Sequence, residues 1–196
     1  MNAAGIRRGW AATCLLAGLG WTNLMADELF LIDDRGSAGL ESSLGTPWRL
    51  ITDGVMGGVS RGELALDNIA GRACLRLQGD VKLENSGGFI QAALDVANTS
   101  AADASAYRGL LLEVYGNDEE YRLHLRTGDV WLPWQSYRAA FTAAPRWQSV
   151  QLPFAAFSGY RITRKLDLGS LERIGVVAIG RAFEADLCIA RLALYR

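Results

Sequence analysis

The segment from Asp53 to Gly62 holds the residues whose spacing could support nucleophilic chemistry. It contains Gly58-Val-Ser60-Arg-Gly62, which fits the pattern Gly-x-Ser-x-Gly. In a serine hydrolase this pattern joins a strand to a helix, and an acid and a histidine follow downstream. Here the next residues alternate as a strand does, and His124 is the only histidine of the chain. The pattern therefore does not predict a hydrolase, and we expect no catalytic residues and no enzyme.

A structural role fits the same segment better. Four glycines in ten residues allow tight turns, because glycine adopts positive φ without strain. We interpret residues 53–62 as a glycine-shaped crossing that lets two strands pack closely, with a ligand-contacting loop as the alternative. On this interpretation Gly57 and Gly58 matter for folding, and replacing Ser60 has a much milder effect.

Two tryptophans form a second candidate site. Trp131 and Trp134 flank Pro133 in a connection between two expected strands. If exposed, their indoles would offer stacking platforms for a sugar or anchors for a protein. The alternative is that both rings plug the end of a hydrophobic core. We predict that one of the two is exposed and contributes to binding.

Alternation in the strand expected around His124 places basic side chains on one face. The inward residues are apolar, and the outward ones are Arg122, His124 and Arg126. With Glu113 and Tyr115 on the preceding strand they could line a binding groove, and a solvated strand face is the alternative. The flanking arginines disfavour a charged histidine, which does not suit a general acid near neutral pH.

Metal and redox sites have little support. Asp33 and Asp34 lie at a turn where a jelly roll can hold calcium, but their spacing is not diagnostic, so we predict no metal and no cofactor. Two cysteines and one histidine beyond the leader make a zinc site improbable. A disulfide between Cys74 and Cys188 is the alternative to separate thiols. Alternation puts Cys74 on the exposed face of its strand and Cys188 on the same face as Leu192, so separate thiols are predicted.

Short segments that alternate between apolar and polar residues position these candidates. They are 29–32, 47–51, 63–66, 73–77, 88–94, 108–116, 120–126, 137–141, 147–152, 173–179 and 187–195. A turn at 117–119 would join two of them as a hairpin. Helical signal is confined to residues 97–106 and 168–171. The pattern predicts an all-β, two-sheet jelly-roll sandwich that forms a single domain over residues 27–196.

The N-terminal segment and the charge balance indicate an exported binding protein. Residues 1–26 have the order of a signal peptide: a basic start, an apolar run too short to span a bilayer, and a small residue. A mitochondrial presequence and an uncleaved membrane anchor are the alternatives to a cleaved signal peptide and a periplasmic or secreted location. Without Arg7 and Arg8, the 20 Lys+Arg become 18 against 21 Asp+Glu, a net charge of −3. This charge argues against nucleic acid as a partner, and the mature chain is not expected to span a membrane.

The segment Asp53-Gly-Val-Met-Gly-Gly-Val-Ser60 resembles the signature of the complex I intermediate-associated protein 30 family. Trp48 before it, Asn85-Ser-Gly-Gly-Phe89 after it and the aromatic-rich segments 134–141 and 147–154 agree in order and spacing. The motif residues carried over are Asp53, Gly54, Met56, Gly57, Gly58 and Ser60. The resemblance spans roughly residues 29–195 and implies a galactose-binding-like jelly roll with no catalytic residue set.

Two functions are expected. The resemblance implies a non-catalytic, chaperone-like factor that binds a protein partner and is related to the assembly factors of respiratory NADH:ubiquinone oxidoreductase. The fold and the tryptophans suit the alternative, an envelope module that binds a carbohydrate or another small ligand. In either case the predicted binding residues are Trp131, Trp134, Arg122, His124 and Arg126.

Overall fold

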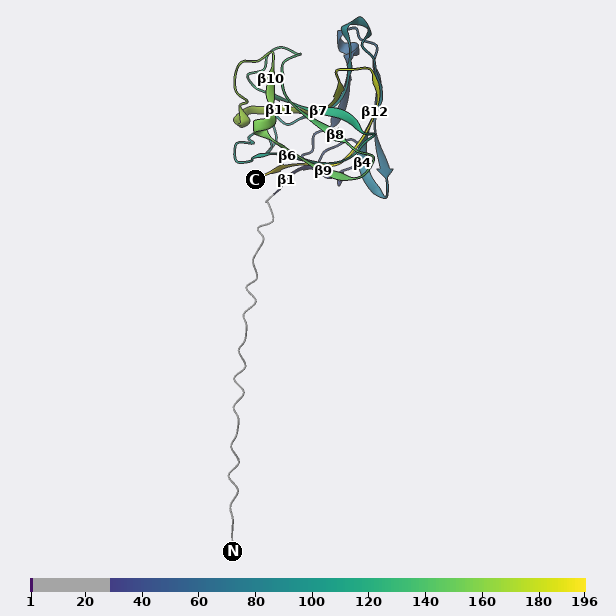
Figure 1. Cartoon of the computed structure of the whole chain (residues 1–196). Helices are drawn as coiled ribbons and strands as arrows, with labels where there is room; N and C mark the ends of the chain where they lie inside the picture. Colours follow the sequence, from purple (N-terminus) through teal and green to yellow (C-terminus); the bar gives the residue numbers. More distant parts are fainter. Residues whose placement is uncertain (2–28) are drawn as a thin grey trace.

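The computed structural model describes residues 29–196 together with Met1, and β-strands make up most of this part (Figure 1). The strands are β1 (Phe30–Asp33), β2 (Trp48–Thr52), β3 (Arg61–Ile69), β4 (Arg72–Val81), β5 (Phe89–Asp95), β6 (Gly109–Tyr115), β7 (Glu119–Thr127), β8 (Ser136–Ala143), β9 (Gln148–Pro153), β10 (Ser158–Tyr160), β11 (Leu171–Ile179) and β12 (Phe183–Tyr195). Single 3-10 turns occur at η1 (Asp53–Met56), η2 (Glu84–Ser86), η3 (Phe154–Ala156) and η4 (Leu168–Ser170). The predicted signal peptide, residues 1–26, lies outside the described residues apart from Met1.

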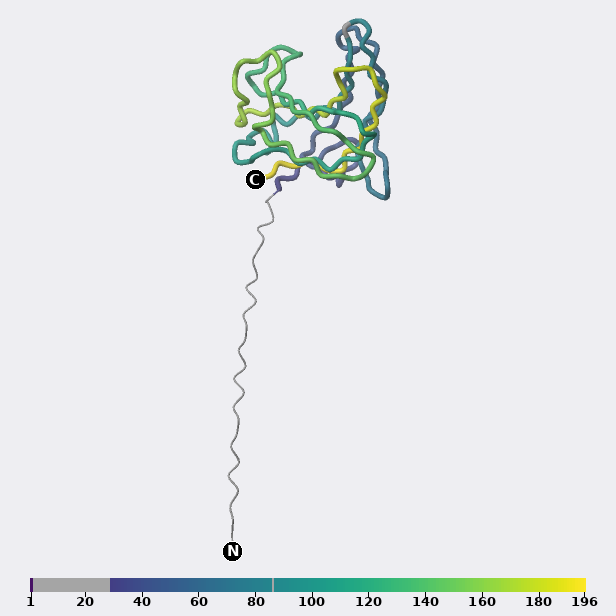
Figure 2. The backbone as a smooth tube through the Cα atoms, in the orientation of Figure 1, coloured from purple at the N-terminus to yellow at the C-terminus, as the bar shows by residue number. Residues whose placement is uncertain are grey.

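The strands form two antiparallel sheets. The first sheet has the order β3-β4-β12-β6-β9, and β1 also pairs with β12. The second sheet has the order β10-β8-β7-β11-β5-β2. Figures 1 and 2 show the chain passing repeatedly between the two sheets rather than completing one before the other. The predicted all-β, two-sheet sandwich is confirmed.

The hydrophobic core lies between the sheets because each strand turns one apolar face inward. Leu75 and Leu112 contribute from the first sheet, and Leu123 and Val176 from the second; all four are fully buried. A buried side chain of this size stabilises the fold by about 1.5–3 kcal/mol relative to its exposed state. The pattern of alternation located these strands correctly because burying one face of a strand requires a period of two.

The hairpin predicted around residues 117–119 does not form. β6 belongs to the first sheet and β7 to the second, so this segment crosses between sheets. Its backbone pairs with the end of β8: the Gly116 and Asp118 N–H groups donate to the carbonyls of Ala144 (2.9 Å) and Ala143 (2.8 Å). A Cβ at Gly116 would lie 2.4 Å from that of Ala143, so glycine permits this close approach. As a consequence, Glu113 does not lie beside the arginine face of β7.

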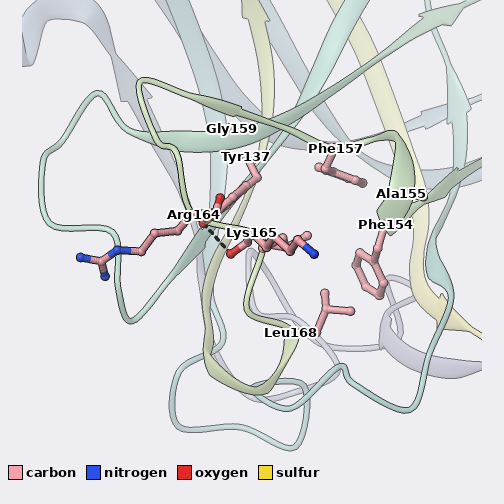
Figure 3. Close-up of a pocket in the computed structure, with 9 residues that line it drawn as sticks. Tyr137, Phe154, Ala155, Phe157, Gly159, Arg164, Lys165 and Leu168 are labelled. Carbon is pink, nitrogen blue, oxygen red and sulfur yellow. Dashed lines mark hydrogen bonds between the residues drawn. The ribbon is translucent and has the colours of Figure 1, made fainter.

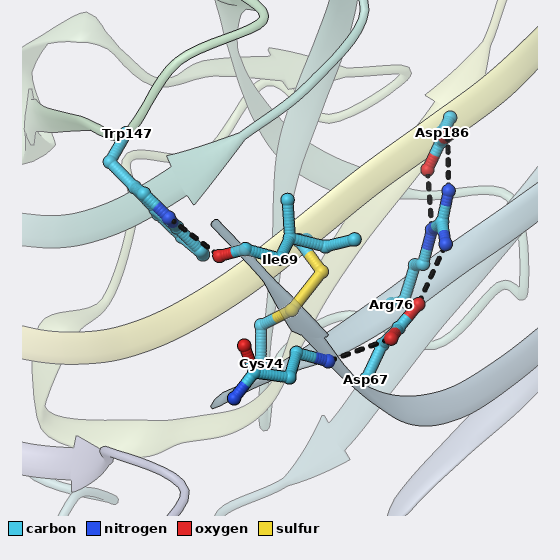
Figure 4. Close-up of a disulfide and its surroundings, with 8 residues drawn as sticks. Asp67, Ile69, Cys74, Arg76, Trp147 and Asp186 are labelled. Carbon is cyan, nitrogen blue, oxygen red and sulfur yellow. Dashed lines mark hydrogen bonds and ion pairs between the residues drawn. A yellow bond between two sulfur atoms is a disulfide. The ribbon is translucent and has the colours of Figure 1, made fainter. Parts of the chain in front are cut away.

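The prediction of separate thiols at Cys74 and Cys188 is wrong, because the two residues form a disulfide with their Cα atoms 5.5 Å apart. The register of β12 against β6 shifts between Ile189 and Arg191, which indicates a β-bulge. The bulge reverses which residues point inward, so Ile189 and Leu192 both reach the core. Cys188 therefore points outward on the same side as Cys74, in a small cluster that Trp147 helps to cover (Figure 4).

Candidate binding site

Asp53 is the structural centre of the glycine-rich segment. Its carboxylate is fully buried at the start of η1. The Oδ2 atom accepts hydrogen bonds from the Gly88 N–H (2.5 Å) and the Ser60 hydroxyl (2.5 Å), and the Oδ1 atom accepts one from the Ser60 N–H (3.0 Å). One carboxylate therefore joins the first glycine segment to the second one, which precedes β5.

Two glycines leave room for this carboxylate. A Cβ at Gly58 would lie 2.3 Å from the Asp53 Cγ atom, and one at Gly87 would lie 2.4 Å from its Oδ2 atom. Burial alone would raise the pKa of the Asp53 carboxyl, but the donated hydrogen bonds, led by that of the Ser60 hydroxyl, outweigh burial and hold the pKa below its ordinary value. Gly57, with φ of 87°, supplies the left-handed residue that ends η1. The structure therefore requires glycine at positions 57 and 58 of the motif.

Ser60 holds the fold together and is not arranged as a nucleophile. Its hydroxyl donates to Asp53 and accepts a hydrogen bond from the Lys82 N–H (3.0 Å), which links the entry to β3 with the end of β4. A strand follows Ser60 instead of a helix, and within the described chain no hydrogen bond joins it to His124. Because this hydroxyl is buried and makes hydrogen bonds to both Asp53 and Lys82, we now expect its removal to lower the stability of the fold more than the sequence indicated.

The other motif residues lie at the surface and apart from the tryptophans. Gly54 and Met56 are exposed in η1, which follows edge strand β2. Trp131 and Trp134 belong to the loop between β7 and β8, close to the opposite edge strand β10. In Figures 1 and 2 the two regions form separate projections on the same side of the molecule. The structure therefore does not combine the motif and the tryptophans in one site.

The tryptophan loop, residues 128–135, exposes its large apolar side chains. The exposed fraction is 83% for Trp131 and 45% for Trp134, and Leu132 between them is also exposed. The core-plug alternative is therefore wrong for both rings. An exposed aromatic and aliphatic group of this kind is typical of a binding surface.

Arg126 holds the tryptophan loop in place instead of facing a ligand. Its Nη1 atom lies 3.0–3.2 Å from the carbonyl oxygens of Leu132, Pro133 and Gln135, and its Nη2 atom lies 3.1 Å from that of Val130. A guanidinium has five donors in a fixed plane, so it can satisfy several backbone acceptors of one turn. The loop thus presents Trp131 in a defined position, and Arg126 is a positioning residue.

A hollow of about 370 Å³ opens on the outer face of the second sheet. Arg122 of β7 and Arg138 of β8 line it, together with strand β10. The Arg138 guanidinium stacks on Tyr160, with its Cζ atom 3.6 Å from the ring centroid. Its Nε atom donates to the Ser136 hydroxyl (2.8 Å), and Nη2 donates to the Trp134 carbonyl (3.2 Å). Arg138 thus connects the hollow to the tryptophan loop.

His124 lies between the two arginines of this face. It stands opposite Arg138 in the β7–β8 register and two residues from Arg122. Its side chain is only 9% exposed, and its Nε2 atom has no hydrogen-bond partner among residues 29–196. Burial and the charges of Arg138 and Arg122 lower the pKa of His124 from 6.5 to about 3. Both causes disfavour the charged imidazole, in the direction that the sequence indicated.

His124 should make the native protein sensitive to mild acid. Below pH 6.5 the unfolded chain takes up a proton that native His124 does not bind until pH about 3. The free energy of unfolding should therefore fall by about 1.4 kcal/mol per pH unit below 6.5, or roughly 2 kcal/mol at pH 5 relative to pH 7.5. Urea unfolding of the wild type and of His124→Gln at several pH values between 5 and 7.5 measures this. His124 is the only histidine, so the free energy of unfolding of His124→Gln should hardly change over this pH range. If the wild type and the variant lose stability equally with falling pH, His124 is not the cause.

A second hollow, of about 350 Å³, is largely apolar (Figure 3). Phe154, Phe157 and Leu168 line it, and the Tyr137 hydroxyl at its side donates to the Lys165 carbonyl (3.0 Å). In Figure 3 the Arg164 guanidinium points away from the hollow. Its lining does not bring several charged groups together, so we assign it no binding role.

The carboxylates of Asp33 and Asp34 serve the fold. Asp33 is buried, pairs with Arg35 and accepts a hydrogen bond from Trp48 Nε1 (2.7 Å); Asp34 accepts one from the Ser43 hydroxyl (3.0 Å). In the described part of the chain no three His, Cys, Asp or Glu residues are grouped to hold a metal ion. Among the same residues there is no helix with the length and apolar character needed to cross a membrane.

Sequence reasoning missed Arg138 and Tyr160 as site residues. Arg138 alternates with the buried Tyr137 and Ala139, so its outward direction could have been predicted from the sequence. Its position opposite His124 was not, because strand register depends on the whole sheet. Tyr160 lies in a strand of only three residues, too short to show a period.

The amino-acid sequence matches the model of one protein family. The sequence model of the family described as complex I intermediate-associated protein 30 matches residues 39–189. This range includes both glycine segments, the tryptophan loop and the hollow. Among curated proteins, none matches the chain in sequence.

Solved structures with a similar fold include carbohydrate-binding modules. The family 11 module of the cellulosomal cellulase Lic26A-Cel5E of Clostridium thermocellum has a TM-score of 0.69 at 12% identity, over 87% of this chain and 95% of that one. A family 11 module of Clostridium thermocellum in complex with a β-1,3-1,4-mixed-linked tetrasaccharide has 0.67 at 11%, over 87% and 96%. The family 30 module of cellulase Cel9D-Cel44B of Clostridium thermocellum has 0.59 at 15%, over 86% and 96%. At such low sequence identity the structural likeness shows the fold alone. It confirms the predicted galactose-binding-like jelly roll.

Proposed function

Because the chain belongs to the complex I intermediate-associated protein 30 family, we propose that it is a non-catalytic assembly factor that binds a protein partner. The proposed contact surface is the tryptophan loop with the adjoining outer face of the second sheet. The observation that carries the proposal is the exposure of Trp131, 83%, in a loop that Arg126 holds in place. A large ring on a loop whose backbone is already held loses less entropy on binding than one on a mobile loop, so it can give much binding energy per residue.

Replacing Trp131 by alanine should weaken partner binding strongly and leave the fold intact. The side chain is almost fully exposed, so the free energy of unfolding should change by less than about 0.5 kcal/mol. Loss of a central aromatic anchor should weaken partner binding by 2 kcal/mol or more, about 30-fold. Thermal melts and affinity capture from the envelope fraction of the producing organism, with mass spectrometry, measure the two effects.

Leu66→Ala is the matched control, because Leu66 is an exposed apolar residue of β3 in the other sheet. A polypeptide that the wild type and Leu66→Ala retain and Trp131→Ala loses supports the proposal. If the wild type retains no polypeptide, or Trp131→Ala retains the same one equally, the proposed function is wrong.

A carbohydrate ligand is the second candidate. The likeness to carbohydrate-binding modules favours it, as do the exposed rings of Trp131 and Trp134. Stacking on an indole would change tryptophan fluorescence. Titration with neutral β-glucan oligosaccharides should change this fluorescence in the wild type and less in Trp131→Ala if a sugar is the ligand.

We further propose that the protein is exported, to the periplasm or the medium. The Cys74–Cys188 disulfide supports this location, because such bonds persist in oxidising compartments. N-terminal sequencing of the protein from its native host should find a start near Asp27. Cytosolic protein that begins at Met1 would contradict export.

A further inference from the structure

The charges of most arginines in the two sheets have carboxylate partners. Arg76 on the first sheet donates to Asp67 (2.6 Å) and, through two nitrogens, to Asp186 (2.8 and 2.7 Å), as Figure 4 shows. On the second sheet Arg173 pairs with Asp95 (2.5 Å). A half-buried guanidinium is generally paired in this way, since removing its charge from water is unfavourable.

The two arginines of the 370 Å³ hollow have little such compensation. Arg138 has no carboxylate partner among residues 29–196, and Arg122 has only Glu120 at 3.5 Å, where Glu120 is largely exposed. The Arg122 Nε atom is buried without a hydrogen-bond partner. Both arginines project from the same face of neighbouring strands: Arg138 stands directly opposite His124, and Arg122 precedes His124 by two residues. His124 supplies no negative charge. Two like charges are thus held together with almost no counter-charge.

We propose that this hollow binds a carboxylate from an acidic segment of the protein partner. Two guanidiniums at one opening can bind a carboxylate through paired, charge-assisted hydrogen bonds, for which their planar donor sets are suited. The inference rests on the proposed function and adds the chemistry of the partner. An acidic side chain of the partner would enter the hollow, and neighbouring apolar side chains would contact the tryptophan loop.

The surroundings of the hollow favour a polypeptide over an acidic polysaccharide. Leu132 is an exposed aliphatic side chain and offers a sugar no ring to stack on, whereas it suits an apolar side chain of a peptide. Tyr160 lines the hollow, but the Arg138 guanidinium already stacks on its ring at 3.6 Å. The stacking surface inside the hollow is therefore partly occupied, while its charge is not balanced.

The test measures the binding of a defined acidic peptide to the full chain. The probe is a fluorescein-labelled peptide with two glutamates flanked by leucines, followed by fluorescence anisotropy at low ionic strength. Arg122→Gln with Arg138→Gln should weaken binding at least ~10-fold, because each lost charged hydrogen bond contributes more than a factor of ten. Arg122→Lys with Arg138→Lys keeps the charge and loses the planar fork, so its affinity should lie in between.

Arg49→Gln is the matched control. It is compared with each single variant, Arg122→Gln and Arg138→Gln, because all three remove one positive charge from the same face of the second sheet. Arg49 lies on edge strand β2, three strands away from β7. This variant should change the affinity less than twofold, and the glutamine version of the peptide should bind at least ~10-fold more weakly than the glutamate version. Thermal melts exclude unfolding as the cause of any loss.

Three outcomes of the peptide assay would overturn the inference. They are equal weakening by Arg49→Gln, equal binding of the glutamine peptide, and binding of a galacturonic acid oligomer without binding of the acidic peptide. The capture experiment distinguishes a failure of this inference from a failure of the proposed function. If Arg122→Gln with Arg138→Gln retains the captured polypeptide as the wild type does, the protein partner stands and its carboxylate contact does not.

Discussion

Replacing Asp53 by alanine is expected to lower the free energy of unfolding by about 3–6 kcal/mol. The substitution leaves the buried N–H groups of Ser60 and Gly88 without their acceptor, and the Ser60 hydroxyl keeps only its longer contact to the Lys82 carbonyl (3.2 Å). Each buried donor without a partner costs about 1–3 kcal/mol. Domains of this size are stable by only about 5–15 kcal/mol, so the variant should be close to unfolding. Urea denaturation followed by tryptophan fluorescence measures the change.

Asp53→Asn separates the charge of Asp53 from its shape, and Asp118→Asn serves as the control. Asp53→Asn is nearly isosteric but places an amide donor among donors, so it should lose almost as much stability as the alanine variant. Asp118→Asn changes an exposed acid in a turn and should stay within about 0.5 kcal/mol of the wild type. If Asp53→Ala unfolds at the same urea concentration as the wild type, the carboxylate does not organise the two glycine segments.

Removing the disulfide is expected to destabilise the protein by about 3–5 kcal/mol. Cys74 and Cys188 are 114 positions apart, so the bond closes a large loop of the unfolded chain. A loop of about 100 residues corresponds to roughly 4.7 kcal/mol of lost loop entropy, and measured values fall between about 2 and 5 kcal/mol. Chemical denaturation of the double variant Cys74→Ala with Cys188→Ala measures the loss.

Reductant provides the control for this experiment. It should destabilise the wild type and have no effect on the double variant, because only the wild type has the cross-link. Thiol titration of the unfolded full chain should find one free thiol, Cys14, out of three cysteines. Three free thiols would mean that Cys74 and Cys188 are not paired.

The strands were predictable because alternation is a local consequence of burying one face. Residues 120–126 show this clearly: Tyr121, Leu123 and Leu125 are in the core, and Arg122 points outward as predicted. The exception is β10, whose three residues cannot show a period. The glycine segments were recognisable for the same local reason, since a chain that turns tightly needs glycine at particular positions.

Alternation failed where it was extended through an irregular position. A single extra residue near Ala190 in β12 reverses the faces on either side of it, which moved Cys188 from the predicted core face to the outer one. A bulge leaves no signature in a run such as Leu187–Leu194, where residues on both faces are apolar. The disulfide was missed for this reason.

The amino-acid sequence by itself determined the fold class, the family and the outward direction of Arg122 and His124, because these depend on local periodicity and on a specific motif. The tertiary structure decided what each candidate does. It buried Asp53 as a hydrogen-bond centre, exposed Trp131, directed Arg126 to the backbone of the tryptophan loop and placed Arg138 beside Arg122. Each of these outcomes depends on strand register and on crossings between sheets. Register is set by the packing of all strands together, and no segment of a few residues contains that information.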